Sequence, residues 1–365
     1  MKFILLIVCI LPYHIKSQKL LMYAGTYTNK GSQGIYVFSF DKKTGLLNLS
    51  SNTIGISNPS FIAISPDKKM LYAVEENNPG MINAFAINQS NGKLSFINTE
   101  NTGGAGPCYV SIDKKGKLCL VANYSSGNIS VLPILFDGSL GEPIQTIQHD
   151  SVQAIKNKDG KPHAHSVNIA PNNKDVFVTD LGIDKIMSYT LDEKSGKLNP
   201  SKIPYIKTGN GSGPRHFDFH PNGKFAYCIF ESASAIMGYK YRNGTLEQLE
   251  SITTLPNDFS KINYCADIHI SPDGKFLYGS NRGHNSIVIY SINQRTGKLK
   301  LIGHQSTLGD FPRNFVIDPD GNYLLVANQK SDNIQVFKID RKKGYLKAIN
   351  SEIKVSMPVC LKFLQ

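Results

Sequence analysis

The chain has 365 residues, of which 41% are hydrophobic, and it carries a formal net charge of +12. This apolar content is ample for a buried core and excludes a wholly disordered chain. The lysines stand mainly in turns, and no basic cluster alternates with aromatic residues. We therefore expect a solvated surface and no nucleic-acid partner.

The N-terminus is predicted to be a signal peptide over residues 1–18. Lys2 gives a short positive segment, residues 3–11 are apolar, and Ser17 is a small residue near the expected cleavage point. The apolar run is too short to span a bilayer. We expect a secreted or periplasmic protein with no membrane association after removal of the leader. A cytoplasmic protein that keeps its leader is the alternative.

From about Lys19 onward the chain repeats one pattern seven times, with a period of roughly fifty residues. Within each repeat, alternating apolar strands are joined by tight turns such as residues 271–275. A Gly-marked hairpin turn recurs in every repeat, at Gly45, Gly92, Gly138, Gly196, Gly244, Gly297 and Gly344. Four antiparallel strands in each of seven repeats predict an all-β, seven-bladed β-propeller.

The two ends of this repeating region complement each other. Residues 357–364 resemble the first strand of a blade with nothing after it, and residues 20–25 and 34–40 resemble a blade that lacks its first strand. Pairing them completes the seventh blade and leaves no exposed sheet edge. Residues 19–365 are therefore predicted to form a single propeller domain whose ring is closed by the N- and C-terminal strands.

The cysteines indicate neither disulfides nor a metal site. Five follow the leader, an odd number without any Cys-x-x-Cys spacing, and all fall in predicted strands: Cys108, Cys119, Cys228, Cys265 and Cys360. We expect them to be buried free thiols that pack as small apolar residues. No metal and no other cofactor is expected.

Aligning the repeats gathers polar residues at the central channel. We number the blades from the repeat that contains Ser60. In blade order, the first position of each inner strand holds Ser60, Cys108, His165, Arg215, Ala266, Arg313 and Val359, and the next position adds His216, Asp267 and Asn314. The ends of the second strands hold Glu76, Tyr124, Leu181, Glu231, Arg282 and Gln329. Ionisable residues thus concentrate in blades 3 to 6, which favours a functional site because unpaired buried charges cost free energy.

Structural roles are the alternative for each of these residues. His165 could cap a strand end, Arg215 and Arg313 could pair with nearby aspartates (Asp218, Asp267 or Asp318), and Glu231 could form an ion pair with Arg282 between blades. The longest connection between blades leads through His163 into the strand of His165, and we expect it to act as a lid or specificity loop.

Four segments together resemble the lactonase family of seven-bladed propellers. They are Lys161–Pro171, the Gly-Pro-Arg-His segment at 213–216, the Ala-Asp-Ile-His segment at 266–269 and the Pro-Arg-Asn-Phe segment at 312–315. That family includes propeller-type 6-phosphogluconolactonases and carboxy-muconate lactonising enzymes, and the resemblance covers essentially all of the chain after the leader. It implies a lactonase with catalytic His165, Arg215, Glu231 and Arg282, and with substrate-binding His163, His216, Asp267 and Arg313.

These residue types suit the opening of an anionic sugar lactone. The reaction needs a base to take a proton from water and cationic donors to stabilise the oxyanion at the carbonyl. Either His165 or Glu231 could be the base, and arginine binds carboxylate or phosphate groups with a planar fork. The alternatives are a carboxy-muconate cyclase-type lactonising enzyme and a propeller that binds a glycan or protein without catalysis.

Overall fold

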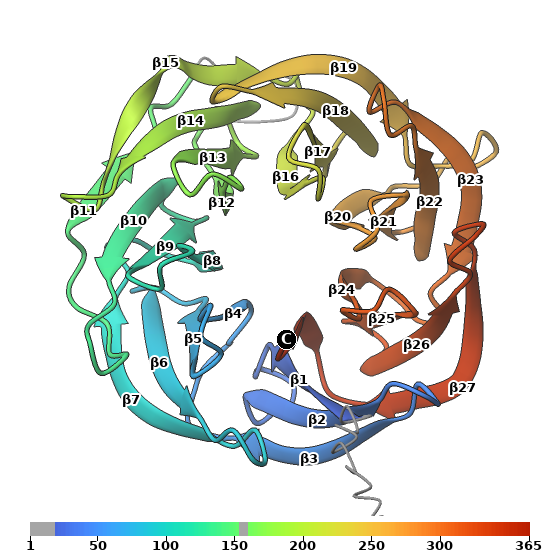
Figure 1. Ribbon diagram of the computed structural model, residues 1–365, viewed down its shortest axis with the longest axis horizontal. Coiled ribbons are helices and arrows are strands. Elements are labelled where there is room, and N and C mark those ends of the chain that lie inside the picture. The colour runs from blue at the N-terminus through green and yellow to red at the C-terminus, as the bar shows by residue number, and fades with distance from the viewer. Residues whose placement is uncertain (1–18, 153–159) are drawn as a thin grey trace, which may run out of the picture.

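The computed structural model describes residues 19–152 and 160–365, and the predicted leader (1–18) lies outside them. Seven four-stranded antiparallel sheets surround a central channel (Figure 1), which confirms the predicted seven-bladed, all-β propeller. Every regular element in the described ranges is a strand. None of these residues forms a helix that is long and apolar enough to cross a lipid bilayer.

Each blade consists of four consecutive strands, except the seventh. Blade 1 contains β4 (Ile62–Ile64), β5 (Met70–Glu75), β6 (Met81–Ile87) and β7 (Leu94–Asn101). Blade 2 contains β8 (Pro107–Ile112), β9 (Leu118–Asn123), β10 (Asn128–Pro133) and β11 (Gln145–Gln148). Blade 3 contains β12 (Ala164–Ile169), β13 (Asp175–Asp180), β14 (Lys185–Asp192) and β15 (Lys197–Lys207). Blade 4 contains β16 (Pro214–Phe219), β17 (Phe225–Phe230), β18 (Ala235–Arg242) and β19 (Thr245–Thr253). Blade 5 contains β20 (Tyr264–Ile270), β21 (Phe276–Arg282), β22 (Ser286–Ile292) and β23 (Leu299–Ser306). Blade 6 contains β24 (Pro312–Ile317), β25 (Tyr323–Asn328), β26 (Asn333–Ile339) and β27 (Leu346–Lys354).

Blade 7 combines both ends of the described chain, as the sequence predicts. It contains β28 (Pro358–Phe363), β1 (Lys19–Thr26), β2 (Ile35–Asp41) and β3 (Leu47–Thr53). The C-terminal strand β28 pairs antiparallel with β1, with Met22 opposite Phe363 and Ala24 opposite Leu361. This pairing closes the ring and gives the inner strand of every blade a partner.

Hydrophobic clusters lie between neighbouring blades rather than within one sheet. One joins β1 and β2 to the strands of blades 1 and 2, and another joins β2 to β25 and β26 of blade 6. The other four each join two adjacent blades, which together link blade 2 through to blade 6. A single blade cannot bury its apolar faces alone, so stability depends on an unbroken ring.

Tyrosine hydroxyls tie each of five blades to the next. A tyrosine of the second strand donates to a backbone carbonyl in the outer hairpin of the following blade: Tyr23 to Gly92 (2.9 Å), Tyr72 to Gly138 (3.0 Å), Tyr227 to Gly297 (2.7 Å), Tyr278 to Gly344 (3.0 Å) and Tyr323 to Lys43 (3.1 Å). The close packing of each hairpin against the neighbouring blade explains why it contains a glycine. Gly297 has φ of 73°, and a Cβ there would lie 2.5 Å from the Phe225 ring.

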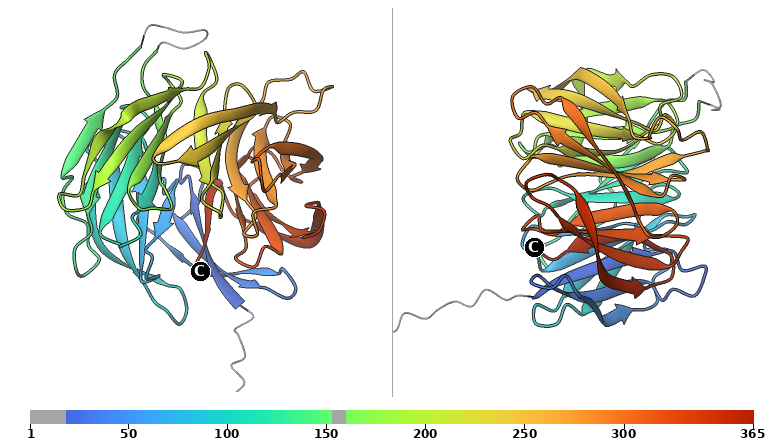
Figure 2. Two further views of the ribbon diagram at one scale, coloured as in Figure 1. Left: turned by 45° about the horizontal axis from the view of Figure 1, so that its top comes forward. Right: turned by 90° about the vertical axis from the view of Figure 1, so that its right-hand side faces the viewer.

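The propeller has two unlike faces, seen edge-on in Figure 2. On the face that we call the site face, inner strands begin and second strands end. The opposite face, the hairpin face, carries the tight turns and the Gly-marked hairpins, and β28 ends there. Within the long connection between β11 and β12, residues 153–159 lie outside the described residues, so the predicted lid or specificity loop is described only at its two ends.

Candidate functional site

A β-bulge at the start of the inner strands aims side chains into the channel mouth. The pairing register of the first and second strands shifts between Pro107 and Tyr109, between Ala164 and Ser166, between Pro214 and His216, and between Pro312 and Asn314. The residues inside these shifts are Cys108, His165, Arg215 and Arg313. A bulge leaves its extra residue out of the ladder and re-aims its side chain. The same local irregularity therefore places three candidate site residues in blades 3, 4 and 6.

Glu231 joins two of the predicted catalytic arginines. Its Oε2 accepts from Arg215 Nε at 2.9 Å and from Arg282 Nη2 at 2.5 Å. Arg282 also donates to the carbonyls of Tyr264 and Cys265, which fixes its plane. The ion pair between Glu231 and Arg282 does link blades 4 and 5, as the structural alternative proposed. It also holds two guanidinium groups side by side at the mouth, an arrangement suited to an anion.

His216 is oriented by partners on both ring nitrogens. Arg215 Nη1 lies 3.2 Å from Nε2, and Asp267 Oδ1 lies 2.7 Å from Nδ1. Because a guanidinium only donates, Nε2 must accept, and the ring proton is on Nδ1 facing Asp267. Burial and the adjacent Arg215 charge lower the pKa of His216 to about 4. His216 is therefore neutral, and its hydrogen bond with Arg215 holds that guanidinium in place.

Asp267 is the buried end of this network. Its Oδ2 accepts from the backbone N–H of Phe315 at 3.2 Å and from the Asn314 amide, and His269 Nε2 lies 3.2 Å away. Burial disfavours the carboxylate, but His269 and His216 outweigh burial and hold the pKa of Asp267 well below its ordinary value. With only 2% of its surface exposed, Asp267 is placed to position His216. Its predicted direct contact with substrate stays a prediction.

His165 faces the same cluster with one nitrogen uncommitted. Its Nδ1 lies 3.8 Å from Cys108 Sγ, and its ring packs edge-on against Tyr124 and His216 at 5.4 Å and 5.2 Å between centroids. In the described part of the chain, no hydrogen bond engages its Nε2. Burial and the charge of Arg215 lower the pKa of His165 well below its ordinary value. The imidazole is therefore neutral near pH 7 and can accept a proton.

Sequence reasoning missed Tyr27 at the mouth and did not select Glu76, which it had aligned there, as a site residue. The Tyr27 hydroxyl accepts from Arg313 Nη2 at 2.9 Å and donates to Glu76 Oε2 at 2.8 Å. Glu76 was visible in the alignment at the position of Glu231 and Arg282. Tyr27 holds the equivalent position in blade 7, just after β1. Carrying the alignment across the junction of the two chain ends would have found it.

An aromatic layer lies in the channel beneath the site. Phe61 stacks on Tyr109 with centroids 4.1 Å apart, and the His216 ring packs edge-on against both. On the hairpin-face side of this layer lies a separate cavity of about 360 Å³, lined by residues of blades 1, 2 and 7.

His163 lies beside the mouth, at the end of the long connection. Its ring stacks on Tyr124 with centroids 4.6 Å apart, and its Nδ1 lies 2.9 Å from the Tyr124 carbonyl oxygen. Its backbone N–H donates to Asp180 Oδ1 at 2.8 Å. This geometry holds Tyr124 against His165. A direct role of His163 in substrate binding stays a prediction.

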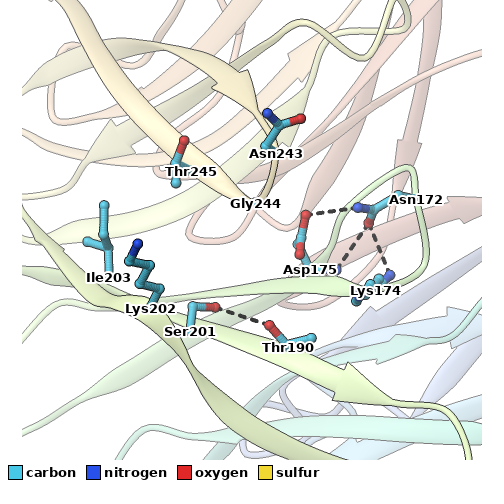
Figure 3. A pocket seen from close by; sticks show the side chains of 10 residues that line it. All are labelled: Asn172, Lys174, Asp175, Thr190, Ser201, Lys202, Ile203, Asn243, Gly244 and Thr245. Carbon is cyan, nitrogen blue, oxygen red and sulfur yellow. Dashed lines mark hydrogen bonds between the residues drawn. The ribbon is translucent and has the colours of Figure 1, made fainter.

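The groove in Figure 3 lies away from this constellation. Its volume is about 410 Å³, and it is lined by turn and outer-strand residues of blades 3 and 4 at the hairpin face. Its polar groups serve each other: Asn172 donates to Asp175 at 2.8 Å, and the Tyr241 hydroxyl donates to the same carboxylate at 2.5 Å. Lys174 and Lys202 line the groove, but the described residues around it include no arginine and no histidine, so the site face remains the candidate site.

The described residues contain no group of three or more His, Cys, Asp or Glu side chains that could hold a metal ion. The five cysteines among them are free and buried, each in a strand, as the sequence predicts. Burial raises the pKa of the Cys108 thiol beside His165, so it remains protonated. The charged and imidazole side chains gathered at the mouth include His165, Arg215, Glu231 and Arg282.

Comparisons with known proteins agree with this architecture. A family model described as "Lactonase, 7-bladed beta-propeller" matches residues 21–363. The 6-phosphogluconolactonase of Bacillus subtilis is 35% identical over 95% of this chain and 99% of its own length. The 6-phosphogluconolactonase of Formosa agariphila is 41% identical over 81% of this chain and 86% of its own length.

A solved structure gives the same result in three dimensions. The periplasmic gluconolactonase PpgL of Pseudomonas aeruginosa matches with a TM-score of 0.90 and 32% identity, over 94% of this chain and 99% of that one. Fold, repeat organisation and sequence agree over nearly the whole described length. The chain therefore belongs to the lactonase family of seven-bladed β-propellers.

Proposed function

We propose that the protein hydrolyses an anionic sugar lactone at the site face, with 6-phosphogluconolactone as the first candidate substrate. The observation that carries the proposal is the pairing of a neutral, uncommitted imidazole with a cluster of arginines. Nε2 of His165 and Nη2 of Arg215 engage in no hydrogen bond within residues 19–152 and 160–365. A proton acceptor and a cationic donor thus lie at the same channel mouth. The similarity to other proteins gives separate support, because relatives at 35% and 41% identity are 6-phosphogluconolactonases.

In the proposed reaction, His165 Nε2 takes a proton from a water molecule whose oxygen attacks the lactone carbonyl carbon. The carbonyl oxygen becomes an oxyanion, which the free N–H groups of Arg215 and Arg282 stabilise. When the ring C–O bond breaks, the protonated His165 returns its proton to the departing oxygen. The product is the open hydroxy acid, and the enzyme regains its starting state.

Glu231 suits the role of organising the cations better than that of base. Burial disfavours its charge, but Arg282 and Arg215 outweigh burial and lower its pKa below the ordinary value. Its Oε2 is already engaged by two guanidinium groups, whereas His165 Nε2 has no hydrogen-bond partner among the described residues. The bonds of Glu231 fix both arginines, and the pKa of Arg215, lowered to about 10 by burial and by neighbouring arginines, still leaves that group charged at neutral pH.

A substrate panel tests the proposal. We expect saturable opening of 6-phosphogluconolactone above its spontaneous rate, with lower kcat/KM for plain gluconolactone, because the mouth is rich in cations. Proton release at constant pH measures the hydrolysis, and enzyme-free reactions give the background. Turnover of a carboxy-muconate substrate alone would support the lactonising-enzyme alternative. Failure to open any lactone, with tight binding of a glycan or protein at the site face, would contradict the proposal.

We also propose that the protein is exported, with residues 1–18 removed. The support is the composition of the leader and the periplasmic location of the gluconolactonase PpgL. N-terminal sequencing of the protein purified from its native host should begin at or near Gln18 or Lys19. An intact Met1 on protein from the cytoplasmic fraction would contradict export. Cell fractionation with a cytoplasmic marker enzyme provides the control.

A further inference from the structure

We infer that the channel mouth has a second end, centred on Arg313, that binds an anionic oxygen group of the substrate remote from the lactone carbonyl. The inference rests on the proposed lactonase function and deepens it. Its members are Arg313 of blade 6, Tyr27 of blade 7, and Glu76 and Ser60 of blade 1. We call this set the anchoring end, and we call His165, Arg215, Glu231 and Arg282 the reaction end.

The two ends lie on opposite sides of the seven-blade ring. The reaction end comes from blades 3, 4 and 5, whereas the anchoring end comes from blades 6, 7 and 1, and the two groups of blades face each other across the channel (Figure 1). They are close enough to interact. The charge of Arg313 contributes to lowering the pKa values of His165, Arg215 and Glu231. A ligand above the aromatic layer can therefore touch both ends.

Arg313 differs from the other two arginines in how its charge is balanced. Arg215 and Arg282 each bond directly to the Glu231 carboxylate, but the partner of Arg313 is the neutral Tyr27 hydroxyl. The Arg313 guanidinium also lies over the Tyr27 ring, 5.4 Å from its centroid. Among the described residues, Arg313 makes no ion pair within 4.0 Å and no hydrogen bond from Nε or Nη1. Its fork is thus held in place while its charge remains available.

Glu76 influences the charge of Arg313 through Tyr27, which lies between them. It accepts from the Tyr27 hydroxyl at 2.8 Å, so the order across the mouth is carboxylate, phenol, guanidinium. Burial disfavours the Arg313 charge, but Tyr27, Glu76 and Glu231 outweigh burial and raise its pKa. Arg313 therefore stays charged at all working pH values. The phenol keeps Glu76 from neutralising it through a direct contact.

Buried polar atoms in the blades of the anchoring end lack a hydrogen-bond partner among the described residues. The Ser60 hydroxyl, at the position equivalent to Arg215, is buried without a partner among the described residues, and Ser60 is 4% exposed. In blade 6, Gln329 Oε1 is likewise buried without a partner in the described chain, at the position equivalent to Glu231. Buried polar atoms normally find partners, because leaving them unsatisfied costs free energy. A phosphate with neighbouring hydroxyl groups could supply them.

This arrangement selects a class of lactone. The carbonyl must meet the reaction end while an anionic group reaches Arg313, so the anion must lie on the far side of the sugar from the carbonyl. A phosphomonoester meets this requirement, and so does a carboxylate at the distal carbon. Arginine binds both through paired N–H groups. The test below distinguishes the two sources.

The test compares Arg313→Gln with Glu76→Gln, because the two changes should act in opposite directions. Arg313→Gln removes the cation, and it should lower kcat/KM for 6-phosphogluconolactone relative to gluconolactone by about 10- to 100-fold. Glu76→Gln removes the opposing charge while keeping an acceptor for Tyr27, so it should lower the KM for the phosphorylated lactone. A lactone with a distal carboxylate, measured in the same way, shows which anion the anchoring end prefers.

Calorimetric titration with the open acids 6-phosphogluconate and gluconate provides a readout that does not depend on turnover. Wild-type protein should bind 6-phosphogluconate more tightly, and Arg313→Gln should remove that preference. If wild-type protein opens no lactone, the proposed function fails while the titration still tests the anchoring end. Equal losses for anionic and neutral ligands in both variants would mean that these residues only support the fold, and would overturn the inference.

Discussion

Replacement of His165 by alanine should lower kcat for lactone opening by about 10²–10⁴-fold, the range typical for loss of a general acid–base group. The expectation follows from His165 Nε2, which has no hydrogen-bond partner among the described residues, and from the charge of the nearby Arg215. His216 cannot substitute, because Arg215 and Asp267 occupy its nitrogens. His165→Gln should show a similar loss while filling more of the space between Tyr124 and His216.

The pH dependence identifies the base. His165 must be unprotonated to act, and burial, Arg215, His216 and Arg313 hold its pKa well below its ordinary value. Activity in kcat/KM should therefore persist as pH falls below 6.5, and it should be lost only as pH passes through the lowered pKa. Glu231→Gln should reduce the rate but keep this acid limb. His165→Gln should remove it.

A matched control is His220→Gln, just after β16 at the hairpin face, where the ring nitrogen Nε2 lies 2.9 Å from the Gly274 carbonyl oxygen. Its kinetics should equal those of wild type. Equal kcat for His165→Gln and wild type would rule out His165 as the base. Loss of the acid limb in Glu231→Gln, with its retention in His165→Gln, would assign that role to Glu231.

The fold could be predicted from sequence because each repeat carries its own local signals. Alternating apolar residues, tight turns and a hairpin glycine specify strands and connections within one blade. The seven-fold recurrence then supplies the tertiary arrangement, since each blade must pack on its neighbours. Ring closure could also be predicted, because residues 357–364 supply the first strand that the blade containing residues 20–40 lacks.

The clustering of the candidate site residues could be predicted from sequence, but the hydrogen bonds and ion pairs among them could not. The alignment brought His165, Arg215, Glu231 and Arg282 together because equivalent positions meet at one channel. It could not show that one carboxylate oxygen holds two arginines, or that Asp267 is saturated by buried partners. Those features depend on rotamers and on contacts between blades. Tyr27 was missed for a topological reason: its blade is assembled from both ends of the chain, so the repeat containing it looked incomplete.

Deletion of residues 357–365 should strongly destabilise the whole protein, the largest effect on stability that we expect from a short change. The deletion removes β28, whose buried side chains include Val359, Leu361 and Phe363. Full burial of such a side chain contributes about 1.5–3 kcal/mol. The lost burial thus approaches the ~5–15 kcal/mol net stability of a typical domain. The deletion also leaves β1 with an open edge, which favours aggregation.

The same strand is connected to the reaction end through hydrogen bonds. The backbone N–H of Leu361 donates to Asn314 Oδ1 at 2.7 Å, and the Asn314 amide donates to Asp267. From Asp267 the network continues through His216 to Arg215. Opening the ring should therefore disturb Arg215, the proposed oxyanion donor, even in molecules that keep their other blades. On heating, the truncated protein should lose activity at or below the temperature at which it unfolds cooperatively.

Adding the missing strand back as a peptide separates closure from other effects of truncation. A synthetic peptide of residues 357–365 should pair with β1, as a strand added to an open sheet edge does. It should raise the midpoint of thermal unfolding with a dependence on peptide concentration, because binding stabilises only the folded form. A peptide of the same composition in scrambled order should do neither, and removal of Gln365 alone, which is exposed, should leave the midpoint unchanged. Recovery of lactone opening together with the unfolding midpoint is expected if β28 both closes the ring and supports Asn314. A truncated protein that unfolds at the wild-type temperature would show that the ring does not need this strand.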